Sequence, residues 1–191
     1  MEEKLDIRSR RRLAILTAAA EEFCQNGFDH ARMDAIAMRV GIGKSTIYEY
    51  FPSKTALFTA VGEQMAEQAK REMGIILEED VPFRHKMLNY MRFLTTLMAQ
   101  MGQKFLNVFR ENTSLSLIDE IGQRYHTELY NMVLDAVKRA RDAGELRAGL
   151  DPVVATALLT SVPGTLLKKY DVSAEALVDL LMQGMDVCGG K

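Results

Sequence analysis

Residue types that mark several protein classes are scarce in this sequence of 191 residues, which has no tryptophan, two cysteines, four prolines and three histidines. Cys24 and Cys188 lie near opposite ends and form no CxxC or Cys/His spacing. A structural zinc site, or any other metal site, is therefore not expected. Both thiols are expected to be reduced, as in a cytoplasmic protein.

Strand signals and long apolar runs are also missing. No sustained period-two alternation occurs, and no hairpin dipeptide such as Asn-Gly joins two apolar runs, so a β-sheet is not predicted. No apolar run is long enough to cross a bilayer, and the charged start lacks the apolar core of a secretory leader. We therefore expect a cytoplasmic protein with no membrane partner and no cofactor.

The residues of common catalytic motifs are absent as well. His30, His85 and His126 are far apart and form no metal-spaced pair. The sequence has no GxSxG elbow, no phosphate-binding glycine loop and no HExxH motif. Asp119 and Glu120 are more typical of a solvated helix than of a catalytic cluster. An enzyme is therefore not expected.

Helical periodicity, in contrast, runs through the whole sequence. Hydrophobic residues make up 48% and charged residues 26%, which is ordinary for a globular protein. Apolar stripes at helical spacing are separated by glycine, proline and capping residues, which predicts an all-α fold of about nine helices. The predicted breaks and helix starts are Asn26-Gly27, Gly41, Pro52, Ser53, Pro82, Gly102, Gly144, Asp151-Pro152, Pro163-Gly164 and Ser173.

The segment from Met33 to Lys54 predicts two short helices joined by a glycine turn. Gly41-Ile42-Gly43 supplies residues that tolerate a positive φ, so the first helix can stop there and the chain can turn sharply. The first helix has one apolar face, made by residues at i, i+3, i+4 and i+7: Met33, Ile36, Ala37 and Val40.

A short polar helix follows this turn. Lys44 begins it, and Pro52 ends it because proline disfavours the α conformation at Phe51. Ser53 is placed to cap the next helix, which is predicted to run to about Leu77. A helix, a glycine turn and a short polar helix make a helix-turn-helix, whose second helix enters the major groove of double-stranded DNA.

The run GIGKSTIYEYFPSKTALF (residues 41–58) resembles the recognition region of the TetR/AcrR family of transcriptional repressors. The resemblance covers roughly the first third of the chain. Two positions depart from the family pattern: Gly43 stands in place of the usual serine, and Arg32 in place of a capping threonine. Gly43 removes one possible phosphate contact, and Arg32 can supply a charged one. The matching positions are Ile15, Ala19, Phe23, Gly27, Phe28, Ile36, Ala37, Gly41, Tyr48, Tyr50, Phe51 and Lys54.

The resemblance implies a set of DNA-binding residues on and beside the short helix. Lys44, Ser45 and Thr46 lie at its N-terminal end, where side chains and free backbone N–H groups meet bases and phosphates. Ile47 and Phe51 are expected to anchor the helix in its own core. The full set of predicted DNA-binding residues is Arg32, Lys44, Ser45, Thr46, Tyr48, Tyr50 and Lys54.

Four arginines crowd at the start of the sequence: Arg8, Arg10, Arg11 and Arg12. Two interpretations fit them equally. They can form a basic solvated tail, or an N-terminal arm that lies along DNA phosphates or dips into a minor groove. We therefore predict a DNA-binding domain with a basic arm over residues 1–54.

Residues 55–191 are predicted to form a helical ligand-binding and dimerisation domain. Methionine adapts to varied apolar ligands, so a methionine-rich stripe is a candidate pocket wall. A tightly packed core is the alternative, and for any single residue it is the favoured one. The candidate ligand-binding residues are Met87, Tyr90, Met91, Leu94, Met98, Phe105, Phe109, Tyr125 and Leu129.

The last two helices carry apolar residues on more than one face, which indicates a partner, and the resemblance implies a homodimer through these helices. Together with the resemblance, this predicts a transcriptional repressor that binds a palindromic operator as a homodimer and is released by a small apolar or amphipathic effector. A rival interpretation keeps DNA binding but has a solid C-terminal domain that binds no small molecule.

Overall fold

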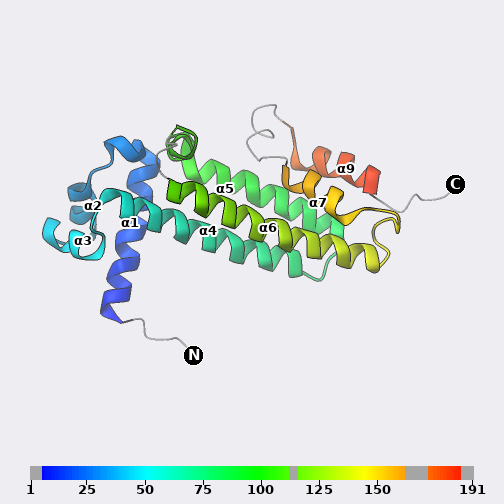
Figure 1. Cartoon of the computed structure of the whole chain (residues 1–191), viewed down its shortest axis with the longest axis horizontal. Coiled ribbons are helices and arrows are strands. Elements are labelled where there is room, and N and C mark those ends of the chain that lie inside the picture. The colour runs from blue at the N-terminus through cyan, green and yellow to red at the C-terminus, as the bar shows by residue number, and fades with distance from the viewer. Residues whose placement is uncertain (1–5, 112–115, 162–171, 186–191) are drawn as a thin grey trace. The chain divides into compact units, whose positions relative to one another are not determined.

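A computed structural model describes residues 6–111, 116–161 and 172–185, with side chains described outside residues 98, 100–111 and 116–121 (Figure 1). Within these ranges the chain forms eight α-helices and no strand, so the predicted all-α fold is confirmed. The helices are α1 (Ile7–His30), α2 (Met33–Val40), α3 (Lys44–Tyr50), α4 (Lys54–Glu78), α5 (Phe83–Glu111), α6 (Ser116–Asp142), α7 (Pro152–Ser161) and α9 (Ala174–Met185).

The chain divides into two compact units. The first comprises Met1–Glu67 and Met101–Gly122, and the second comprises Gln68–Gln100 and Gln123–Lys191. Helices α4, α5 and α6 therefore each contribute residues to both units. The functional division into residues 1–54 and 55–191 stays a prediction.

The core of the first unit is built where α2, α3 and the start of α4 pack beside α1 (Figure 1). Phe23 meets Phe58 edge-on with ring centroids 4.9 Å apart, and Phe28 meets Phe58 at 5.2 Å. Edge-to-face rings at these distances are favourable beyond the apolar area they bury. Other buried members include Ile15, Leu16, Ala19, Ile36, Ala37, Ile47, Phe51, Leu57 and Val61.

Helix α1 is interrupted at Asn26-Gly27 as predicted, because Gly27 has a non-helical backbone conformation. It begins at Ile7 after Asp6 and continues to His30 through a kink at Gly27, where φ is 74°. The arginine cluster therefore lies in the first turns of α1, which corrects the predicted arm or tail before the helix. Arginine has a high helix propensity, so these residues continue the amphipathic helix that follows them instead of forming a separate segment.

Helix α5 also corrects a predicted break. It runs from Phe83 to Glu111 through Gly102, where the sequence suggested an end or a kink. A single glycine in a helix interior is less favourable than alanine by only about 1 kcal/mol, which the packing of a long helix outweighs. The predicted break at Pro163-Gly164 lies outside the described residues.

Capping residues begin the later helices as predicted. Ser53 Oγ accepts a hydrogen bond from Ala56 N at 3.0 Å. Asp151 Oδ1 accepts one from Val153 N at 2.8 Å. Each oxygen satisfies a backbone N–H that has no partner within the first turn of its helix.

The second unit has its own core, to which α4, α5, α6, α7 and α9 all contribute. Tyr90 is buried in it, and burial raises the pKa of its phenol to about 12. Two exposed ion pairs join α5 to α9: Arg84 with Asp179, and Arg92 with Glu175. None of the helices in the described ranges has the length and apolar content needed to span a membrane.

Candidate nucleic-acid interface

Helix α3 has one buried face and one polar face. Ile47 is 0% exposed and Phe51, which follows the helix, is 3% exposed, so the predicted anchors are confirmed. Residues four apart lie on the same side of a helix, so burial of this pair turns the other residues outward. Lys44, Ser45 and Tyr48 are exposed, and Thr46 is half-buried. The polar face is therefore held in place by the core beneath it.

The turn that orients α3 depends on one left-handed residue. Gly41 has a φ of 73°. Its N–H donates to Met38 O at 3.1 Å, while Ile42 N donates to Ala37 O at 3.0 Å. This pair of bonds is the Schellman motif, which closes a helix and reverses the chain. Gly43, in contrast, has an ordinary φ of −72°, so the expectation that it uses glycine's freedom is wrong.

Lys54 lies at the start of α4 and is bound within the first unit. Its Nζ donates to Asp29 O at 3.0 Å and to Ala31 O at 3.3 Å. The same ammonium lies 4.7 Å from the centroid of the Phe28 ring, which is a cation–π distance. Lys54 therefore ties the start of α4 to the connection between α1 and α2. Its predicted DNA contact stays a prediction.

Arg32 lies just before α2 and pairs with a carboxylate. Its Nε and Nη2 donate to the two oxygens of Asp34, at 3.2 and 2.6 Å. This fork raises the pKa of the guanidinium and lowers the pKa of the Asp34 carboxyl. The Arg32 side chain makes no capping bond at the start of α2. A phosphate would have to compete with Asp34 for it.

Two carboxylates of α1 hold the end of α2. Arg39 Nη1 donates to Glu21 at 2.7 Å, and Nη2 approaches the carboxylate of Glu22 at 3.5 Å. Glu22 is buried, and its other oxygen accepts a bond from Arg32 N at 3.4 Å. A buried carboxylate needs such partners, so these contacts fix α2 against α1.

The candidate ligand-binding residues fall into three groups. Met87, Tyr90 and Met91 are each no more than 1% exposed in the second unit's core. Leu94 and Leu129 are half-buried against that core, and Tyr125 is also half-buried. The side chains of Met98, Phe105 and Phe109 lie outside the described residues. The burial of Met87, Tyr90 and Met91 supports the alternative that these residues belong to a packed core. The predicted set of ligand-binding residues stays a prediction.

The recognition segment and its supporting core match a known family. The family model described as bacterial regulatory proteins, tetR family, matches residues 15–61, which include α2, α3 and the start of α4. Over these residues the chain is similar to the TetR family of bacterial regulators. Members of this family are ligand-responsive regulators that bind DNA.

Two relatives of this chain match it over most of its length. It is 24% identical over 139 residues to the uncharacterized HTH-type transcriptional regulator YhgD of Bacillus subtilis, and the match covers 72% of each chain. It is 28% identical over 168 residues to the HTH-type transcriptional regulator UidR of Escherichia coli, covering 87% of this chain and 83% of UidR. Both relatives are described as transcriptional regulators.

Solved structures support the fold. A TetR-family regulator from Mesorhizobium loti superposes with a TM-score of 0.72 at 19% identity, over 95% of this chain and 100% of that one. The transcriptional regulator FadR of Bacillus subtilis, in complex with stearoyl-CoA, superposes with a TM-score of 0.65 at 20% identity, over 90% and 95%. The chain thus has a TetR-like fold with an N-terminal helix-turn-helix and a C-terminal helical domain.

The contrast between the two glycines of the turn gives a matched pair of substitutions. Gly41→Ala should lower the free energy of unfolding by about 1 to 2 kcal/mol, because an L-residue is strained in the left-handed region. No atom lies within 4 Å of the added Cβ, so the loss is conformational and not steric. Gly43→Ser should be neutral or stabilising by a few tenths of a kcal/mol, because serine is a good N-cap.

Urea denaturation of the full chain, followed by circular dichroism, measures both changes. Equal destabilisation by the two substitutions would contradict this account of the turn.

Proposed function

We propose that this chain represses transcription as a homodimer bound to a palindromic operator, and that a small amphipathic effector releases it. The observation that carries the proposal is the polar face of α3, anchored at Ile47 and exposed at Lys44, Ser45 and Tyr48. A two-fold dimer with two such helices about 34–36 Å apart would fit successive major grooves on one side of the duplex.

The proposed DNA contacts differ in how they act. Lys44, Ser45, Thr46 and Tyr48 are the residues proposed to reach bases and phosphates directly. Lys54 is expected to act by holding the connection between α1 and α2, because moving its ammonium to a phosphate would break the bonds to two carbonyl oxygens. The remaining residues proposed to flank the duplex are Arg32 and Tyr50.

Exposed apolar residues on α7 and α9 support dimerisation. Leu158 and Leu180 are 51% and 67% exposed, and Val153 and Val154 are more than half exposed. On the same two helices Leu159 and Val178 are buried in the core. The helices thus present apolar residues both to the core and to solvent, and a second copy of the chain would cover the outer face.

The proposed effector is amphipathic because one polar group on α4 is buried without a partner. Among the described residues, Gln64 Oε1 is a buried side-chain acceptor with no hydrogen-bond donor. Such a group favours a bound molecule that brings a donor. The structural neighbour FadR is described in complex with stearoyl-CoA, a large amphipathic ligand. Helix α4 contributes residues to both units. We therefore propose that the ligand acts through α4 to lower the population of the conformation that binds DNA.

Selection from a random duplex pool, followed by fluorescence anisotropy on the enriched duplex across a salt series, tests DNA binding. Lys44→Met should lower the slope of log affinity against log salt by about 0.9, the value for one lost phosphate contact. Lys54→Met should weaken binding and lower the melting temperature, while the slope stays unchanged.

The two lysines serve as matched controls for each other. A reduced salt slope for Lys54→Met with an unchanged melting temperature would instead make Lys54 a direct phosphate ligand. Failure of the pool to yield a palindrome bound by two protomers would contradict the proposed repressor.

Leu158→Glu combined with Leu180→Glu should convert the dimer into a monomer, because two carboxylates would be buried in an apolar interface. Analytical ultracentrifugation measures the change. Ile75→Glu is the matched control, since Ile75 is an apolar residue of α4 that is 63% exposed. A double variant that still sediments as a dimer would mean that the interface lies on other helices.

A thermal-shift panel of amphipathic compounds, with stearoyl-CoA as its reference probe, tests ligand sensing. A compound at a hundred times its dissociation constant should stabilise the protein by about 2.7 kcal/mol, and should also weaken binding to the enriched duplex. Stabilisation without any change in DNA affinity would exclude release by that compound. No stabilisation across the panel would favour the rival regulator that binds no small molecule.

A further inference from the structure

The arginine cluster lies on a rigid helix beside the recognition helix. The guanidinium of Arg8 lies 5.9 Å from the centroid of the Tyr50 ring, and that of Arg12 lies 5.1 Å from the centroid of the Phe51 ring. Residues 8 and 12 are one helical turn apart, so they present one face of α1 to the end of α3. These contacts place two cations next to the last residues of the recognition segment.

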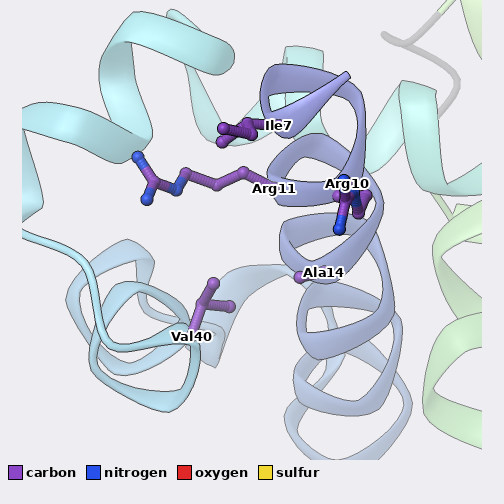
Figure 2. A pocket seen from close by; sticks show the side chains of 5 residues that line it. All are labelled: Ile7, Arg10, Arg11, Ala14 and Val40. Atoms are coloured by element: carbon purple, nitrogen blue, oxygen red, sulfur yellow. The ribbon is translucent and has the colours of Figure 1, made fainter. Parts of the chain in front are cut away.

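Arg11 lies on another side of α1, facing the end of α2. Figure 2 shows the Arg11 side chain extending from α1 next to Ile7. Val40 lies on the opposite side of an open groove from Ala14. The groove has a volume of about 310 Å³ and is lined by Ile7, Arg10, Arg11, Ala14 and Val40. Val40 immediately precedes the turn that leads to Lys44. Cations of α1 thus lie beside the end of α2 and the end of α3.

These arginines are available to an anionic partner. Arg8, Arg11 and Arg12 are exposed, and among the described residues none of the three forms an ion pair with a carboxylate. The nearest acidic residues along α1 and its groove are Asp6, before the helix, and Glu21, which pairs with Arg39. A cationic surface whose Arg8, Arg11 and Arg12 have no carboxylate partner among the described residues, next to a DNA-reading helix, fits the DNA backbone.

The arginine cluster was predicted either to lie along DNA phosphates or to enter a minor groove. Its helical conformation decides between these two contacts. An α-helix with its side chains is about 10–12 Å wide, whereas the minor groove of B-DNA is about 6 Å wide. The first turns of α1 therefore cannot enter the minor groove as a flexible arm does. Arginines that protrude from a helix at the surface of the duplex can instead meet phosphate oxygens on its rim.

We propose that the first two turns of α1 form a second DNA-binding surface, in which Arg8 and Arg11 bind backbone phosphates beside the segment read by α3. The surface contributes affinity without sequence preference, and the ring of Tyr50 holds Arg8 in place before DNA arrives. This inference rests on the proposed operator binding by α3.

The experiment compares the full wild-type chain with Arg8→Ala, Arg11→Ala and their double variant. Each is titrated by fluorescence anisotropy against the enriched duplex and a scrambled duplex of equal composition, across a fourfold range of salt. Each substitution should reduce the slope of log affinity against log salt by about 0.9. The ratio of wild-type affinity to variant affinity should therefore fall about 3.5-fold from the lowest to the highest salt concentration. The affinity for the enriched duplex and the affinity for the scrambled duplex should fall by the same factor.

Three controls separate this surface from other causes. Arg71→Ala, which removes an exposed arginine of α4 in the second unit, should leave the slope unchanged. Arg11→Lys keeps the charge and should restore the slope. An unchanged melting temperature for each variant, measured by circular dichroism, shows that the fold is intact.

The outcomes are distinct. If wild type selects and binds an operator but the alanine variants keep its salt slope, the α1 surface is wrong and the proposed function stands. A loss confined to the enriched duplex would also overturn the proposal, because it would mean base readout. If wild type binds no duplex at all, the proposed function itself fails.

Discussion

A helix of seven residues is not stable by itself in water, and the proposed DNA-reading element of this protein is such a helix. Its stability comes from Ile47 and Phe51, which are buried among the apolar residues of α1, α2 and α4. The left-handed Gly41 sets the direction in which the helix leaves α2. The exposed polar residues are therefore positioned by interactions made entirely on the opposite side of the helix.

The contacts around α1 extend this dependence. Lys54 joins α4 to the connection that follows α1, and Arg39 joins α2 to the buried carboxylate of Glu22. Each bond links two elements that also meet through apolar side chains, which are tolerant of small sliding movements. Directional bonds to fixed oxygens restrict such sliding. The first unit is thus a body in which α4 cannot shift at its start without moving the connection between α1 and α2.

Local rules predicted the helices well and the partners of charged residues poorly. The stripe from Met33 to Val40, the caps at Ser53 and Asp151 and the end at Gly144 all depend on residues close in sequence, and the structure has them where expected. Lys54 and Arg39 bond to residues 25 and 18 positions away, which no periodicity reveals. The predicted break at Gly102 and the predicted arm or tail at the arginine cluster were wrong, because packing and helix propensity outweighed a local signal.

The alternation of buried and exposed positions on α3 has an evolutionary consequence. Ile47 carries the packing, whereas Lys44, Ser45 and Tyr48 extend into solvent. Substitutions at exposed positions away from caps and buried networks usually change stability by no more than about 0.5 kcal/mol. If these residues read DNA as proposed, mutation can therefore change the operator sequence that is bound while the scaffold stays folded. One fold can in this way diversify its DNA targets much faster than its core.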